Sequence, residues 1–225
     1  MVPSGERLRW QRPPSAVEII WRADLDDMLP NQSGSEAVEL HLAFVGDDAR
    51  LQMRDISALE AVLPDHGRRH GLFTRVEALT PHSDTSKARV TSAGHRPGAG
   101  LVVTRTGQRS AWMPLPRGPI GALLDEDHLA GQLERMLETL TTLDLPAAAL
   151  VIPAAGFEPA SMISVGTVDG PASNSATFGH HMPQRVRPVH DEALEFATIS
   201  SRPREVAAEL AARLVAEHLS ASGLR

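Results

Sequence analysis

Apolar and polar residues alternate in several short stretches of the chain, and this period of two predicts β-strands. Four apolar residues at alternate positions from Val38 to Phe44 are expected to bury one face of a sheet. Turn residues at 46–48 and a second alternation at 50–54 predict that this strand belongs to a β-hairpin. Further strands are expected at 16–21, 72–79, 101–105, 109–113, 148–152, 162–168 and 194–199.

Two later stretches repeat apolar residues every three or four positions, which predicts amphipathic helices. The first runs from Leu129 to Leu143, after carboxylates at 125–127 that favour the positive end of a helix dipole. We expect Gly131 to permit a close packing contact within it. The second helix covers 206–219, with Ser200 or Ser201 as its cap and Pro203 in its first turn.

Two shorter helices are expected in the first half of the chain. One spans 23–29, and the other carries the apolar residues between Ile56 and Leu63. Ser57 and Glu60 have the spacing of a capping box, and Pro64 is expected to end that helix. The stretch 80–100 is rich in Gly, Pro, Ser and Asp, which is typical of a long loop.

Together these patterns predict an α+β fold, with a mixed, largely antiparallel sheet and two main amphipathic helices packed on it. Prolines at 114 and 116 mark a change of character. We therefore expect a strand-rich half at 1–115 and an α/β half at 116–225, packed together as one compact unit.

Composition narrows the classes of protein. Among 225 residues, 42% are apolar and none is cysteine, so disulfides, thiolate nucleophiles and sulfur-ligated zinc are excluded. No apolar run is long enough for a spanning helix, and residues 1–25 lack an apolar signal core, so we expect a cytoplasmic protein without membrane contact. All basic residues except Lys87 are arginine, a bias that indicates a high-GC bacterial genome.

Charge is distributed unevenly along the sequence. The formal net charge is −6, yet the stretch 66–109 alone carries an excess of basic residues. A local positive field of this kind could attract phosphates or nucleic acid. The candidate anion-binding residues are Arg68, Arg69, Arg89, Arg96 and Arg109. The alternative is that folding scatters these side chains over several faces.

Histidine and carboxylate groups cluster near the end of the chain. The candidate catalytic residues are His180, His181, His190 and Asp191. Imidazole and carboxylate are common metal ligands, but this spacing fits no known metal motif, so a surface loop is the alternative and we expect no metal or cofactor. His66 and His70 are expected on a turn, because Pro64 and Gly67 disfavour a helix there.

One segment resembles a known family. Ser110-Ala-Trp-Met-Pro-Leu-Pro-Arg117, continued by Leu123-Leu-Asp-Glu-Asp-His-Leu129, resembles accessory regions of AlbA-type, Schlafen-like DNA-binding proteins of high-GC bacteria. The resemblance covers roughly 20 of the 225 positions and includes no catalytic signature. It implies an indirect association with nucleic acid, and it transfers no functional residue to this chain.

The leading hypothesis is a non-enzymatic interaction module, a subunit or accessory domain of a larger assembly, whose association with nucleic acid is what the resemblance implies. Its partner would be another protein or a second copy of the chain, bound partly through the helix faces at 129–143 and 206–219. The alternatives are a phosphate- or nucleic-acid-binding protein using the basic stretch, and a hydrolase or metalloenzyme using the histidine cluster. Imidazoles and acids converging in an enclosed site would reopen the case for catalysis.

Overall fold

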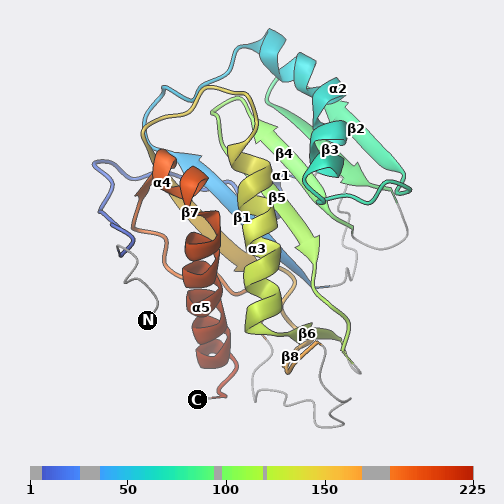
Figure 1. The fold of residues 1–225 in the computed structure, drawn as a ribbon, viewed down its shortest axis with the longest axis vertical. Coiled ribbons are helices and arrows are strands. Elements are labelled where there is room, and N and C mark those ends of the chain that lie inside the picture. Colours follow the sequence, from blue (N-terminus) through green and yellow to red (C-terminus); the bar gives the residue numbers. More distant parts are fainter. Residues whose placement is uncertain (1–6, 26–35, 94–97, 119–120, 169–182, 225) are drawn as a thin grey trace.

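Seven strands form one antiparallel sheet in the computed structural model, which describes residues 7–25, 36–93, 98–118, 121–168 and 183–224 (Figure 1). Their spatial order is β2-β3-β4-β5-β1-β7-β9. Central strand β1 pairs with β5 on one side and with β7 on the other, so both halves of the chain build the same sheet. The strands are β1 (Ala37–Phe44), β2 (Leu79–Ser83), β3 (Lys87–Ser92), β4 (Gly100–Thr104), β5 (Arg109–Pro114), β7 (Leu150–Phe157) and β9 (Leu194–Glu195).

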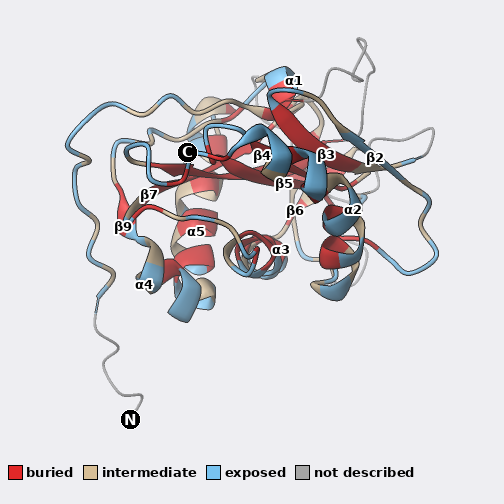
Figure 2. Cartoon of the chain, turned by 90° about the horizontal axis from the view of Figure 1, so that it is seen from above, coloured by how far each residue is buried: buried red, intermediate tan, exposed pale blue. Residues whose placement is uncertain are grey.

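The larger helices cover one face of this sheet. Figure 2 shows α2, α3, α4 and α5 below the sheet and the short α1 above it. In Figure 1, α3 and α5 lie side by side, and α2 lies over the end of the sheet that contains β2 and β3. The helices are α1 (Arg22–Leu25), α2 (Met53–Arg69), α3 (Glu126–Thr141), α4 (Phe196–Ser201) and α5 (Pro203–Ala221).

The main apolar core lies between the sheet and these helices. Every second residue of β1, starting at Val38, points into it, and Leu133 and Leu214 bring the facing sides of α3 and α5 to it. Each fully buried leucine contributes about 2 kcal/mol through the hydrophobic effect. The apolar faces of 129–143 and 206–219 are therefore buried inside the molecule, which removes them as a surface for a partner.

Several predictions are confirmed. The fold is α+β with a largely antiparallel sheet. Strands β4 and β5 form the hairpin expected at 101–113, and the two long helices occur where the apolar spacing places them. Pro203 begins α5, although Arg202 rather than a serine is the capping residue.

The hairpin expected at 38–54 is wrong in its second half. Helix α2 starts at Met53 and includes residues assigned to a strand, because Gln52 and Asp55 form the capping box in place of Ser57 and Glu60. Pro64 lies inside the helix instead of ending it. Leu63 and His66 are both buried beside it, so packing on each side of the proline offsets its lost hydrogen bond.

Other boundaries also differ from the sequence pattern. The expected loop at 80–100 contains β3 and most of β2, whereas most of the strand expected at 72–79 is irregular. Residues 16–21, expected as a strand, are irregular. The strand expected at 162–168 is limited to β8 (Ile163–Val165), which pairs in parallel with β6 (Ala122–Leu124). The strand expected at 194–199 is divided between β9 and α4. A Cβ atom at Gly131 would meet nothing within 4 Å, so no close packing contact explains that glycine.

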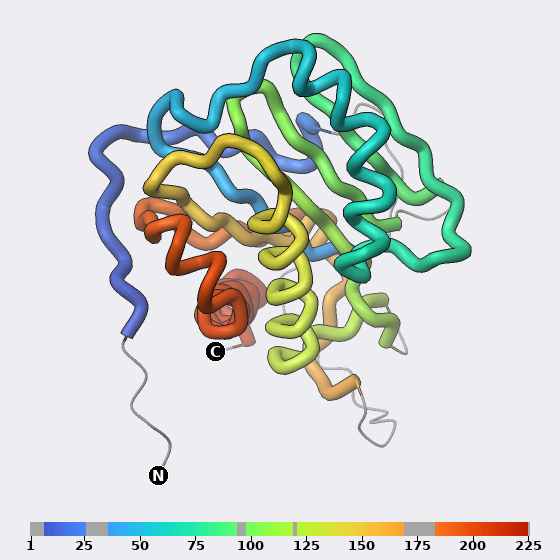
Figure 3. The backbone as a smooth tube through the Cα atoms, turned by 45° about the horizontal axis from the view of Figure 1, so that its top comes forward, coloured from blue at the N-terminus to red at the C-terminus, as the bar shows by residue number. Residues whose placement is uncertain are grey.

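The N-terminal segment, defined here as residues 7–25, begins beside α4 and ends on the face of the sheet opposite the long helices. Gln11 pairs with Ala193 beside β9, and Leu25 packs on Val102 and Trp112 across the second face. Figure 3 follows this segment in blue from its start near α4 to its end behind the sheet. Within the described ranges, no helix is long and apolar enough to cross a membrane.

Candidate functional site

A buried polar network lies beneath the N-terminal segment, on the second face of the sheet. The alternation of β1 that sends leucines to the core sends Glu39 and His41 to this face. His41 is directly opposite Ser110 in the β1–β5 register, and all three side chains are fully buried. The His41 Nδ1 to Ser110 Oγ distance is 2.9 Å, and His41 Nε2 is 3.2 Å from Glu39 Oε2.

Hydrogen bonding gives this network one direction. Burial alone would raise the pKa of Glu39, but the hydrogen bond from His41 and the nearby positive charges outweigh it, so the pKa is lowered and the carboxylate is ionised. His41 Nε2 therefore donates to Glu39. Ser110 Oγ accepts a hydrogen bond from Gln108 Nε2 at 2.9 Å, and in the neutral tautomer that donates from Nε2, His41 Nδ1 accepts the Ser110 proton.

Backbone groups of the N-terminal segment complete the network. Gln108 binds both polar backbone atoms of Ile20, accepting from its N–H at 2.9 Å and donating to its carbonyl at 2.6 Å. The Arg22 N–H donates to Glu39 Oε2 at 3.0 Å, and Lys87 Nζ donates to the Leu25 carbonyl. Three side chains thus bind this segment through its main chain, as a neighbouring strand would.

Trp21 fills the space above the network. The Arg187 guanidinium lies 4.0 Å from the centre of the Trp21 ring, a cation–π contact. The rings of Trp21 and His41 form a T-shaped contact with their centres 4.9 Å apart. The His190 ring also packs against Trp21, with the two ring centres 5.4 Å apart. A Cβ atom at Gly156 would come within 2.9 Å of the indole, so the absence of a side chain there lets Trp21 seat against β7.

The network has the order of a nucleophile, a base and an orienting carboxylate, but it is closed. Ser110, His41 and Glu39 follow that order along the hydrogen bonds. With Trp21 and Ile20 in place, the Ser110 hydroxyl has no exposed surface for a substrate. One imidazole and one carboxylate thus meet in an enclosed site, formed by residues that the sequence analysis did not single out.

An open basic groove lies beside the N-terminal segment, where the segment passes α4 and the start of α5. Its volume is about 470 Å³. Arg7 and Arg9 are exposed, and the Arg202 guanidinium pairs with Glu205 in the first turn of α5. The groove is lined by Arg7, Arg9, Trp10, Gln11, Glu195, Thr198 and Arg202.

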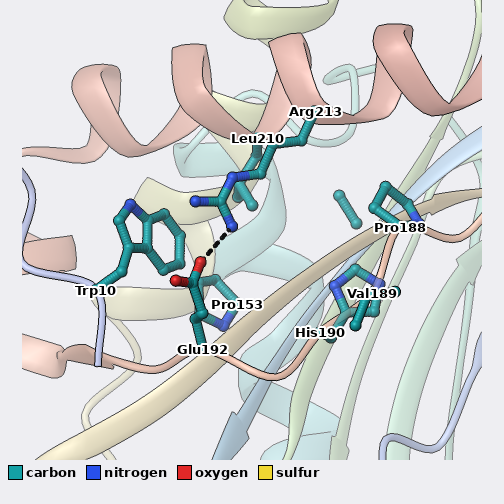
Figure 4. A pocket seen from close by; sticks show the side chains of 9 residues that line it. Trp10, Pro153, Pro188, Val189, His190, Glu192, Leu210 and Arg213 are labelled. Carbon is teal, nitrogen blue, oxygen red and sulfur yellow. Dashed lines mark hydrogen bonds and ion pairs between the residues drawn. The ribbon is translucent and has the colours of Figure 1, made fainter. Parts of the chain in front are cut away.

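Trp10 lines both this groove and a small inner pocket, which Figure 4 shows. Arg213 lies 4.3 Å from the centre of the Trp10 ring and binds Glu192 and Glu209, so one face of the indole is occupied and cannot stack on a nucleic-acid base. The inner pocket has a volume of about 10 Å³, room for one water molecule. His190 borders it, and burial lowers the pKa of this imidazole to about 4.

Of the four predicted catalytic residues, the structure describes His190 and Asp191. His180 and His181 lie outside the described residues, and Asp191 is exposed. His190 Nε2 is buried and finds no hydrogen-bond partner in the described part of the chain, so a water in the inner pocket would satisfy it. No group of three His, Asp or Glu side chains within the described ranges could hold a metal ion.

The predicted anion-binding arginines do not gather on one surface. Arg109 is buried, and its guanidinium donates to the carbonyls of Leu140, Leu145 and Pro146, so it closes the end of α3. Arg68 binds the Glu77 carbonyl.

Of the remaining three members of that set, the two that the structure describes lie in different elements. Arg89 is buried on the second face of the sheet, Arg69 lies in the last turn of α2, and Arg96 lies outside the described residues. His66 and His70, expected on a turn, lie at the end of α2 with their rings 4.6 Å apart. His66 donates to the Thr139 carbonyl, which joins α2 to α3.

Sequence reasoning missed Glu39, His41, Gln108 and Ser110. The period of two in β1 separated Glu39 and His41 from the core, but it implied that this face of the strand met solvent. The available signal was Trp21 and Leu25, two large apolar residues that needed a second surface of the sheet to pack on.

Comparison of the chain with family models, curated proteins and solved structures found no match. The resemblance of 110–129 to accessory regions of AlbA-type proteins therefore stays an expectation. In this structure the two quoted stretches lie in β5 and the turn after it, and in β6 and the start of α3.

Proposed function

We propose that the protein is an interaction module, non-enzymatic in its closed form, that binds an acidic segment of a partner protein in the basic groove. The observation that carries the proposal is the convergence of Arg7, Arg9 and Arg202 on an open groove of about 470 Å³. Guanidinium groups bind carboxylates through charge-assisted hydrogen bonds, often two at a time. Trp10 adds an apolar edge for the stems of glutamate side chains.

An acidic protein segment fits the groove better than nucleic acid does. The groove also contains Glu195, and the whole chain is acidic, with a formal net charge of −6. The net charge disfavours both anionic ligands equally, but Glu195 repels a continuous row of phosphates, whereas the side-chain carboxylates of a flexible acidic segment can turn away from it. Nucleic-acid binding would also require a longer basic surface, and the arginines of 66–109 do not form one among the described residues.

Titration calorimetry with hexaglutamate tests this proposal. We expect a measurable dissociation constant at low salt that weakens as salt screens the charges. Arg7→Glu with Arg202→Glu should weaken binding at least tenfold, because both substitutions replace attraction by repulsion. Arg54→Glu is the matched control, since Arg54 is 80% exposed on α2 at the other end of the sheet, and it should bind as the unmodified protein does.

Three results would contradict the proposal. Absence of hexaglutamate binding at low salt would remove the groove as an anionic binding site. Equal or tighter binding of a thymidine oligonucleotide, with the same loss in the double variant, would assign the groove to nucleic acid instead. Equal weakening by Arg54→Glu would mean that net charge rather than the groove governs the interaction.

A further inference from the structure

We propose that Ser110, His41 and Glu39 form a latent esterase centre that residues Ile20–Leu25 keep closed. This inference goes beyond binding in the basic groove and does not depend on it. The three side chains project from adjacent strands of the rigid sheet, so their mutual geometry does not rely on the N-terminal segment.

The hydrogen-bond order matches what a serine nucleophile needs. Ser110 donates its proton toward His41 Nδ1 at 2.9 Å, and Glu39 orients the imidazole from the opposite nitrogen at 3.2 Å. The imidazole presents Nδ1 rather than Nε2 to the hydroxyl, which is chemically equivalent because either nitrogen can accept the proton. The Glu39 carboxylate is ionised, so it would stabilise the imidazolium that forms.

The closed segment resembles a bound acyl group. The Ile20 carbonyl accepts a hydrogen bond from Gln108 Nε2 at 2.6 Å, and the same nitrogen is 2.9 Å from Ser110 Oγ. A substrate carbonyl in the place of the Ile20 carbonyl would thus accept from Gln108 Nε2, the amide donor that also binds the Ser110 hydroxyl and can stabilise a developing oxyanion. This geometry points to a carboxylic ester with an extended acyl chain as the substrate class.

The reaction balances with water as the only co-reactant. Ser110 Oγ bonds to the ester carbonyl carbon while its proton passes to His41 Nδ1. The carbon–oxygen bond to the alcohol breaks, and the leaving oxygen takes the proton from the imidazolium. Water, deprotonated by His41, then attacks the acyl-serine, releases the acid and restores the Ser110 hydroxyl.

Labelling with a fluorophosphonate probe, followed by mass spectrometry of the Ser110 peptide, tests the proposal. The unmodified protein should label slowly, because Trp21 closes the site. Trp21→Ala should increase the rate of Ser110 labelling at least tenfold and produce hydrolysis of p-nitrophenyl acetate. Leu8→Ala is the control, since Leu8 belongs to the same segment but packs on the main core, and it should label as slowly as the unmodified protein.

Variants in the open background separate nucleophile, base and orienting group. Ser110→Ala with Trp21→Ala should abolish both labelling and hydrolysis, and His41→Phe should do the same. Glu39→Gln in that background should slow labelling at least tenfold and change the pH at which the rate is half-maximal, which a purely structural role would not do.

Hydrogen exchange of residues 20–25 reports whether the segment has opened. The proposal is overturned if Trp21→Ala, or a second variant Arg22→Ala, keeps its far-ultraviolet circular dichroism, exchanges 20–25 rapidly and leaves Ser110 unlabelled. Unchanged exchange in both variants would also contradict it, because closure is assigned to Trp21 and to the Arg22 side chain, which donates to the Glu158 carbonyl at 3.2 Å and lies 5.4 Å from the centre of the Trp112 ring. Ser110 labelling in the unmodified protein as fast as in Trp21→Ala would contradict the closed state.

Discussion

Arg109 is a single residue whose role depends entirely on its surroundings. Its guanidinium lies 5.1 Å from the centre of the Phe44 ring and 5.3 Å from that of Phe196, and it donates to carbonyls at the end of α3. Burial lowers its pKa to about 10, which leaves it charged at neutral pH. Sequence counted this arginine as a possible phosphate ligand, because a charge count cannot distinguish a buried cation from an exposed one.

Arg109→Leu should destabilise the fold by about 3 kcal/mol, because several carbonyls lose charge-assisted hydrogen bonds worth about 1.5 to 3 kcal/mol each while leucine restores part of the packing. Urea unfolding at neutral pH measures the change. Arg54→Leu, at an 80% exposed position, should change stability by less than about 0.5 kcal/mol. Similar stability of Arg109→Leu and the unmodified protein would contradict the structural role of Arg109.

His190 makes the stability depend on pH. Burial, reinforced by the charges of His41, Arg187 and Arg213, lowers its pKa to about 4, and Glu39 opposes this effect only partly. Between the unfolded pKa of about 6.5 and about 4, the unfolded chain binds more protons, so stability falls as pH falls through this range.

His190→Gln should remove up to about 3 kcal/mol of that loss between pH 7 and pH 4. Urea unfolding at several pH values measures the slope. Burial also lowers the pKa of His66 and His218, so some dependence should remain. His82→Gln, at an exposed position of β2, should follow the unmodified curve. An identical slope in His190→Gln would show that this imidazole is not the dominant group.

At the scale of elements, the sequence predicts those parts of the fold that bury one continuous apolar face. Helix α3 and the β4–β5 hairpin are of this kind. Strand β3 was missed because its second face carries Lys87 and Arg89, which the structure buries, and a loop-like composition surrounds it. Tertiary packing likewise extended α2 through Pro64, which local propensity could not indicate.

Substitution of two glycines by alanine is expected to change the stability of the protein in opposite directions. Gly131→Ala should stabilise α3 by about 0.5 to 1 kcal/mol, because alanine favours a helix and a Cβ atom there meets nothing within 4 Å. Gly100→Ala should destabilise β4 by about 1 to 3 kcal/mol, since its Cβ atom would lie 2.0 Å from the Trp112 ring. Thermal unfolding of both variants measures the difference, and a rise in melting temperature for Gly100→Ala would contradict the close contact.

At the scale of the whole molecule, the N-terminal segment joins the two candidate sites. Its first residues form one wall of the basic groove, and its last residues close the polar network. None of this could be predicted from sequence spacing, because the sites combine residues more than a hundred positions apart. The candidate histidines and arginines were chosen by proximity along the chain, whereas the fold assembles its sites across strands.

The most direct test of the groove as the binding surface is nuclear magnetic resonance of the labelled protein during titration with hexaglutamate. We predict shifts concentrated at Arg7, Gln11, Thr198 and the Trp10 indole N–H, with the resonances of β2 and β3 unchanged. Shifts centred on β2 and β3, or no shifts at low salt, would contradict the assignment of function to this groove.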